Sequence, residues 1–355
     1  MNHRCTCHAI QPAAPSPITS LAIHSSSHSL RQRLNILLHT HDIGMYPGDA
    51  DDVRIVAPDF PRLVHLVGGL TEDDRLALRA VPCTAAGPLI WDMHPLHIWA
   101  ERLDSHWFES ATQNLVFYGQ PIVEVRTGEV VAYEALVRAR LGQELIGAGP
   151  LLKAAVAHDQ LRAFDALART TAIRQLYGKL ESSQSLFINF SPGVIYNPDI
   201  CLQTTFQACR EVGADFSRLV FEITEGEDFP DLQLLRSILE RYRREGARVA
   251  LDDLGSGRTS LSYLAELKPD IVKLDRALIQ GLEHSTPAFR LVRSLVEYAH
   301  DLGIQVVAEG IEEPEELAAV RETGVDLVQG YYLGRPAELL SGLSLKATDW
   351  WSAQV

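Results

Sequence analysis

Hydrophobic and polar positions follow a regular rhythm over the last two thirds of the chain. Eight short runs of β-branched and aliphatic residues have the pattern of buried strands: 117–123, 130–136, 185–190, 218–224, 248–254, 270–274, 304–311 and 327–333. From the second run onward they alternate with amphipathic helical stretches such as 150–177, 231–245 and 289–302. Eight strands with crossover helices predict an α/β fold, a (β/α)8 TIM-like barrel over residues 108–355. The first two runs, with Gly128 in the turn between them, predict a hairpin and hence an antiparallel first strand.

The first hundred residues have a different, shorter pattern. Strand-like runs at 20–23, 53–56 and 88–91 alternate with helical stretches at 30–38, 60–66 and 71–80, and a helical segment at 99–108 follows. This pattern predicts a small α/β module over residues 18–107, which we expect to be sensory or regulatory. Residues 1–17 include a tract rich in Pro, Ala and Ser and predict a flexible leader.

Metal binding by the leader and by the histidines is a minor alternative. Cys5 and Cys7, flanked by His3 and His8, could hold zinc, but the spacing is not Cys-x2-Cys and no second cysteine pair follows nearby, which favours an unstructured tail. Ten of the thirteen histidines precede residue 107. Scattered histidines more often have ordinary partners than form a metal or pH sensor.

Composition narrows the classes of partner. The 355 residues are 46% hydrophobic and carry a net charge of -14, which argues against non-specific binding to duplex DNA or to an anionic membrane. A phosphate substrate would therefore need metal ions or a few local cations. Five cysteines without a framework spacing favour a reducing compartment, and no apolar run approaches the ~18 residues of a membrane span. We expect a cytoplasmic protein.

Polar residues end seven of the predicted strands. They are Glu134, Asn189, Glu222, the pair Asp252 and Asp253, Lys273, Glu309 and Gln329. The reacting groups of a TIM barrel project from the carboxyl ends of its strands, so these side chains should converge on one barrel mouth. Taken alone, the aspartate pair fits either a metal site or a helix N-cap with a spare surface acid.

The chemistry of this set is that of hard-cation binding. Carboxylates and an amide oxygen, without His or Cys, can hold two Mg²⁺ or Mn²⁺ ions that clamp a phosphoryl oxygen for in-line displacement. Lys273 can orient the attacking water or neutralise charge on phosphorus, and a salt bridge to a barrel carboxylate is the alternative role for this residue.

Seven motifs occur in order over roughly 116–340: YEALVR at 133–138, NFSP at 189–192, FEITE at 221–225, DDLGSG at 252–257, VKLD at 272–275, AEGIE at 308–312 and QGYY at 329–332. In these motifs the chain resembles the bacterial EAL-domain family, whose members are cyclic di-GMP phosphodiesterases. The resemblance implies hydrolysis of cyclic di-GMP to linear pGpG with two Mg²⁺ or Mn²⁺ ions.

The resemblance also implies roles for single residues. One metal would be bound by Glu134, Asn189, Glu222 and Asp252, and the second would be completed by Asp253 and Glu309. Lys273 would contact the nucleophilic water, with Gln329 and Glu309 in the catalytic network. On the substrate side, Arg138 would bind a phosphate, Gln120 would approach a guanine, and Glu312 would support the site.

Glu225 would steady the loop after the paired aspartates and relate metal binding to a homodimer interface; a surface acid is the alternative. The family usually has Phe, Thr and Tyr where this chain has Leu254, Ser256 and Arg258, and the charge of Arg258 bears on dimer geometry.

Two other functions remain open. One is a non-catalytic cyclic di-GMP receptor signalling to a protein partner, and the other is a phosphodiesterase with another substrate. The module is too short for a diguanylate cyclase domain. We also expect that it has a ligand of its own.

Overall fold

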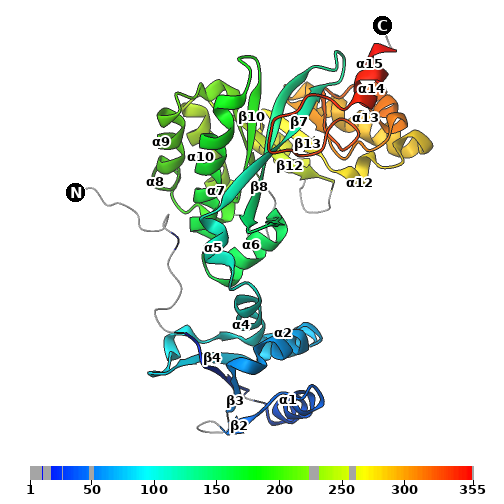
Figure 1. Ribbon diagram of the computed structural model, residues 1–355. Helices are drawn as coiled ribbons and strands as arrows, with labels where there is room; N and C mark the ends of the chain where they lie inside the picture. The colour runs from blue at the N-terminus through cyan, green and yellow to red at the C-terminus, as the bar shows by residue number, and fades with distance from the viewer. Residues whose placement is uncertain are drawn as a thin grey trace. The chain divides into compact units, whose positions relative to one another are not determined.

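The computed structural model describes residues 10, 17–25, 27–47, 52–223, 232–255 and 261–353. These residues form two compact units (Figure 1). The N-terminal unit comprises Ile10–Gln113 with Gly149–Leu161, and the barrel unit comprises Asn114–Ala148 with Arg162–Val355. The segment Gly149–Leu161, which the sequence placed in the barrel domain, groups with the N-terminal unit. Within the described residues the chain therefore passes between the units three times, after Gln113, Ala148 and Leu161.

The N-terminal unit is an antiparallel sheet with helices. Its strands are β1 (Ser20–His24), β2 (Tyr46–Pro47), β3 (Val53–Val56), β4 (Arg79–Thr84), β5 (Gly87–Pro88) and β6 (His94–Pro95), and its helices are α1 (His28–Thr40), α2 (Phe60–Gly68), α3 (Glu72–Ala77), α4 (Leu96–Asp104) and α5 (Phe108–Thr112). The sheet order is β2-β3-β1-β4-β5, with β6 on β4. The central β1 is antiparallel to both β3 and β4, which is the split β-α-β arrangement.

The sequence predicted β1, α1, β3 and α2, and it missed β4. The predicted helix 71–80 ends at Ala77, because Leu78 already has an extended backbone, and the apolar run that follows pairs with β1. Pro82 within that run cannot continue a helix. Leu30, Leu34 and Leu38 bury one face of α1, so its spacing of apolar residues was a reliable signal.

The barrel unit closes on itself. Its eight barrel strands are β7 (Leu115–Glu124), β8 (Val130–Leu141), β10 (Ser185–Phe190), β11 (Leu219–Ile223), β12 (Arg248–Leu254), β13 (Ile271–Leu274), β14 (Gln305–Ala308) and β15 (Leu327–Val328). Pairing runs from β10 through β15 to β7 and β8, and β8 pairs with β10, which closes the ring. The strand β7 is antiparallel to both of its neighbours, and this confirms the predicted first strand. A short β9 (Glu144–Ile146), not predicted, extends β8.

Helices connect the barrel strands, as expected for this fold, and one more, α15, follows the last strand. They are α7 (Leu161–Leu176), α8 (Pro198–Cys201), α9 (Gln203–Glu211), α10 (Leu232–Arg244), α11 (Leu261–Leu267), α12 (Arg276–Ile279), α13 (Thr286–Asp301), α14 (Pro314–Thr323) and α15 (Leu345–Ser352). The predicted helix 150–177 is two helices, α6 (Ala148–Ala157) and α7, because Asp159 between them has a left-handed φ of 56°. No helix among the described residues is long and apolar enough to cross a membrane.

Each barrel strand contributes one apolar residue to a common cluster: Ile122, Ala132, Phe187, Val220, Ala250, Ile271, Val307 and Leu327. All eight are at most 9% exposed. Because alternate residues of a strand share a face, this cluster defines which residues face the barrel interior. The residue two positions away along each strand also faces the interior, so these residues can form a second, functional layer.

Within the N-terminal unit, Arg102 of α4 holds the end of α6. Its Nε donates to the Ala157 carbonyl at 2.5 Å, and its guanidinium also pairs with Asp159 and, at 2.9 Å, with Asp92. The Arg102 side chain is only 10% exposed, and its bonds to the Ala157 carbonyl and to Asp92 are partly buried, whereas Asp159 is 66% exposed. One guanidinium thus joins the first hundred residues to the α6 segment.

Replacing Arg102 with Met should loosen α6. The Ala157 carbonyl and the Asp159 carboxylate lose their charged donor, which we expect to weaken local closure by about 1–3 kcal/mol and to speed amide hydrogen exchange in 149–161 by roughly tenfold or more. Exchange measured by mass spectrometry, with Arg126→Met at a side chain that is 82% exposed as the control, tests this. Unchanged exchange in this segment would show that Arg102 does not hold α6.

Candidate active site

Directly above the apolar cluster, all eight strands present a polar or charged residue on the same face. In seven strands it lies two residues after the apolar one, giving Glu134, Asn189, Glu222, Asp252, Lys273, Glu309 and Gln329. In the antiparallel β7 it lies two residues before, at Gln120, which pairs in register with Glu134. Because β7 runs in the opposite direction, its polar residue comes before its apolar one in the sequence but lies at the same height in the barrel. The eight side chains therefore form one layer.

Lys273 lies at the centre of this layer. Its side chain is 1% exposed, and Nζ is 2.6 Å from Glu309, 3.0 Å from Glu222, 3.3 Å from Asp252 and 3.5 Å from Glu134. Burial disfavours the ammonium, but the four carboxylates outweigh burial and raise the pKa of Lys273 well above its usual value. The ion-pair role that the sequence left open is therefore present in this structure.

Two amide side chains orient the carboxylate of Glu134. Asn189 Nδ2 donates to one oxygen at 2.7 Å and Gln329 Nε2 donates to the other at 2.8 Å. Burial alone would raise the pKa of Glu134, but Lys273 and these two hydrogen bonds together lower it. Because each amide nitrogen is used as a donor, each amide oxygen is left free to face a cation or a water molecule.

A β-bulge brings the two adjacent aspartates together. Three steps from Leu251 to Leu254 on β12 match two steps on β13, so β12 carries one extra residue. Asp253 takes the left-handed φ of 57° that this geometry requires. Neighbouring residues of a regular strand point to opposite faces, whereas here carboxylate oxygens of Asp252, Asp253 and Glu309 lie within 4.8 Å of one another.

The single ammonium of Lys273 cannot neutralise the five carboxylates of the site, which belong to Glu134, Glu222, Asp252, Asp253 and Glu309. Burial, more than any other cause, raises the pKa of Glu222 well above its usual value and that of Glu309 to about 8, against the opposing effect of Lys273. Burial and then the neighbouring Asp252 raise the pKa of Asp253 to about 6. Fully ionised, these five carboxylates and Lys273 would carry a net charge of -4, which two divalent cations would balance.

The donor set fits divalent cations. Glu222 is 0% exposed, and neither of its oxygens has a hydrogen-bond partner among the described residues, although Lys273 Nζ is near one of them. The buried Oε1 of Gln329 likewise has no partner there. Buried polar oxygens without partners are costly, and hard cations with oxygen ligands would satisfy them.

Two glycines let the neighbouring loops approach closely. A Cβ on Gly330, next to Gln329, would come within 2.1 Å of the Ile311 carbonyl oxygen. A Cβ on Gly310, next to Glu309, would meet the Arg276 side chain at 2.5 Å, and the φ of Gly310 is +72°. Both positions require glycine, so the backbone fixes where these two strand ends deliver their side chains.

A hollow of about 230 Å³ adjoins the layer, and its lining includes Gln120, Glu134, Glu309, Gln329, Arg276 and Tyr331. Arg276, which the sequence analysis did not single out, makes two 2.6 Å contacts with the carboxylate oxygens of Glu312. Its position directly after the motif VKLD at 272–275 was the available signal.

The other predicted site residues either lie at the edge of the polar layer or fall outside the described residues. Gln120 is buried and donates to the Gly334 carbonyl at 3.4 Å. Arg138 shares the face of Glu134 but lies four residues, about 13 Å, further along β8, where it donates to the Val137 carbonyl. Glu225, Arg258 and the Cys5 and Cys7 segment lie outside the described residues.

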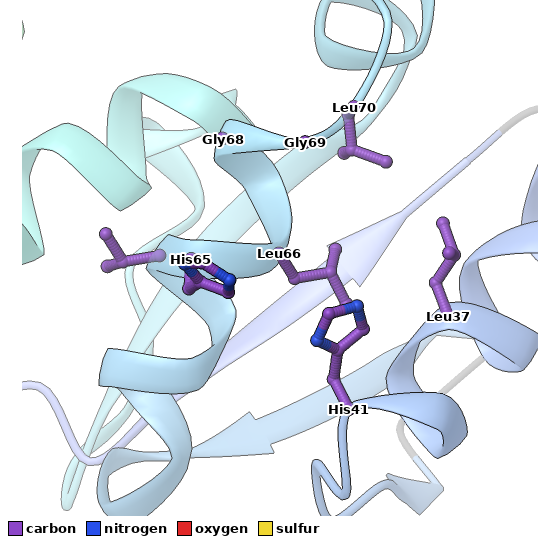
Figure 2. A pocket seen from close by; sticks show the side chains of 8 residues that line it. Leu37, His41, His65, Leu66, Gly68, Gly69 and Leu70 are labelled. Carbon is purple, nitrogen blue, oxygen red and sulfur yellow. The ribbon is translucent and has the colours of Figure 1, made fainter.

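The N-terminal unit has a hollow of its own, of about 360 Å³, between α1 and α2 (Figure 2). His41 and His65 lie on its wall beside Leu37 and Leu66, and the two imidazole centroids are 6.2 Å apart. Other histidines of this unit have separate partners; His24, for example, bonds Asp52 at 2.9 Å. The described histidines thus form no cluster of three or more metal ligands.

Comparisons with known proteins match the part of the chain that forms the barrel. A family model described as EAL domain matches residues 106–336. The cyclic di-GMP phosphodiesterase NbdA of Pseudomonas aeruginosa is 31% identical over 229 residues, which are 63% of this chain and 29% of that protein. The chain spans less than a third of the length of the first curated relatives that it matches.

Two solved structures resemble the barrel unit. A standalone EAL protein from Vibrio cholerae O395 with bound cyclic di-GMP is 34% identical, with a TM-score of 0.59 over 66% of this chain and 98% of that one. Klebsiella pneumoniae BlrP1, in complex with calcium and cyclic di-GMP, is 26% identical, with a TM-score of 0.57 over 70% of this chain and 67% of that one.

Metal-free protein should lose stability as pH rises. The folded state holds protons on Asp253 to about pH 6 and on Glu309 to about pH 8, whereas an unfolded chain releases them near pH 4. Folding therefore takes up protons in this window, and stability falls from about pH 4 to pH 8. Thermal unfolding in chelator should show this fall, and Glu309→Gln should make its upper part smaller, while Glu222, whose pKa is also raised, still contributes. A melting temperature that rises between pH 6 and pH 8 would contradict these pKa shifts.

Replacing Lys273 with Met should destabilise the metal-free barrel. Buried carboxylates then lack their counter-charge, which we expect to cost about 3–5 kcal/mol at pH 8 and less at pH 5, where the acids can protonate. Urea unfolding in chelator measures this, with Lys179→Met at an exposed residue as the matched control. Equal stability of the two variants at pH 8 would show that Lys273 does not balance the cluster.

Proposed function

This chain belongs to the EAL domain family, and we propose that its barrel hydrolyses one phosphodiester of cyclic di-GMP to linear pGpG with the help of two divalent cations. The observation that carries this proposal is the polar layer at the barrel mouth. Eight strands contribute to it, its acids exceed its one ammonium, and it retains buried oxygens that have no hydrogen-bond partner in the described part of the chain. Relatives named as cyclic di-GMP phosphodiesterases support the substrate.

The proposed ligands divide into two groups. Glu134, Asn189, Glu222 and Asp252 would hold one cation, and Asp253 and Glu309 would complete the site of the second. Oxygen donors suit Mg²⁺ or Mn²⁺, and BlrP1 was solved with calcium and cyclic di-GMP. When bound, such ions polarise phosphoryl oxygens and lower the pKa of a bound water.

Lys273 would change partners on cation binding. Its ammonium is fully engaged by carboxylates in this structure, and cations that take over those carboxylates would leave Nζ to orient the attacking water and to neutralise charge that develops on phosphorus. The water oxygen forms the new bond to phosphorus while one ester bond breaks, and the leaving oxygen takes up a proton. Gln329 would hold the water network beside Glu134.

Substrate binding would use groups around the layer. Arg138 offers a guanidinium fork for a phosphate on the face of Glu134, and Gln120 would approach a guanine beside the layer. Glu312, held by Arg276, would support this side of the hollow. Glu225 would steady the loop after the aspartates, and a homodimer formed through the barrel would couple to that loop.

The N-terminal unit would regulate the barrel through α6. This helix follows the β8–β9 hairpin, and β8 carries Glu134 and Arg138, so a change in the grip of Arg102 on α6 acts on the segment next to two site residues. The hollow between α1 and α2 offers space for a small ligand of this unit.

The test is turnover of cyclic di-GMP by the full-length chain with Mg²⁺, with Mn²⁺ and with chelator, scored as pGpG. We expect metal-dependent product from the wild type and a loss of at least about a hundredfold in Glu134→Gln, because that variant loses a charged ligand. Glu129→Gln, at an exposed residue of the same hairpin, is the control and should keep its activity.

The alternative of a non-catalytic receptor makes a different prediction for the same assay. The protons held by Asp253 and Glu309 near neutral pH compete with cations, so a weak metal site would favour that alternative. Tight binding of cyclic di-GMP with no pGpG at millimolar Mg²⁺ or Mn²⁺ would support the receptor and overturn the enzyme. Equal activity of Glu134→Gln and the control would overturn the assignment of the site.

A further inference from the structure

A buried ion pair lies on α7, in the same unit as the proposed metal ligands. Asp165 is 6% exposed and Arg169, one helical turn later, is 2% exposed, and their charged groups are bonded to each other. Arg169 Nε also donates to Thr205 Oγ1 of α9 at 3.2 Å. Taking two charges out of water is expensive, so a buried pair often serves position more than stability.

The second carboxylate oxygen of Asp165 binds the backbone next to Asn189. Among the described residues the ladder between β10 and β11 ends at Phe190, and the next amide along the chain, that of Ser191, donates to Asp165 Oδ1 at 2.9 Å. This partly buried backbone amide needs an acceptor, and here the acceptor is a carboxylate whose other oxygen is bonded to Arg169. The bond therefore anchors the chain two residues beyond Asn189.

We infer that Asp165 is a positioning residue for the cation site: it holds the end of β10 so that Asn189 keeps its carbonyl oxygen toward the cations while its amide donates to Glu134. This inference rests on the proposed function, in which Asn189 is a ligand. Partners that orient a metal ligand commonly change metal affinity by tenfold or more when they are lost.

Two double variants separate this role from a merely structural one. Asp165→Asn with Arg169→Met removes both charges but keeps an oxygen that can accept from Ser191. Asp165→Leu with Arg169→Met removes the same charges and has a side chain of similar shape without an acceptor. Both variants lose the ion pair, so the comparison between them isolates the bond to Ser191.

The primary measurement is the Kd of Mn²⁺, read from the electron paramagnetic resonance signal of the free ion, on full-length protein that circular dichroism shows to be folded. We expect the Leu variant to bind Mn²⁺ about tenfold more weakly than the Asn variant, with little change in kcat at saturating Mn²⁺. Equal Kd values for the two variants would overturn the inference, whatever their stabilities.

The two proposals fail in distinguishable ways. A wild type that binds Mn²⁺ but forms no pGpG overturns the proposed hydrolysis alone, and the Kd comparison still decides the role of Asp165. A wild type that binds no Mn²⁺ overturns both the cation site and the positioning role.

Discussion

The ammonium of Lys273 faces four carboxylates at 2.6 to 3.5 Å inside a closed barrel, and the rest of the site follows from this imbalance. Without the lysine, the acids would repel one another in a medium that already disfavours their charge. With the lysine alone, burial still raises the pKa of Glu222 well above its usual value and that of Glu309 to about 8. The folded chain thus presents a site whose electrostatics are incomplete. Proteins keep such an unfavourable group of charges at functional sites, where a bound cation can supply the missing positive charge.

The convergence of these side chains at the barrel mouth was predictable because it obeys one geometric rule. Alternate residues of a strand share a face, so a polar residue two positions after a buried apolar one, as in Val220 and Glu222, must lie in the layer above it. The motifs gave the same residues by resemblance. The predicted antiparallel first strand is confirmed by the pairing of β7 with β8 and β15.

The features that the sequence did not predict depend on contacts between residues that are distant in the chain. Nothing local in the run at 79–84 signals that it would pair with β1, and the left-handed Asp159 that divides the helices at 150–177 is an ordinary residue in the sequence. Asp165 and Arg169 read as an ordinary i, i+4 pair of a helix, and only their burial against α9 and the Ser191 amide sets them apart. The grip of Arg102 on α6 spans 55 residues.

The reversed direction of β7 decides where a neighbouring domain can be attached. In an all-parallel barrel the chain would enter at the end opposite the reacting groups. Here it enters at Leu115, only five residues before Gln120, so the first strand begins at the end of the barrel where the polar layer lies. Any segment that precedes this strand is therefore joined to the barrel at the end that carries the polar layer, whatever that segment detects.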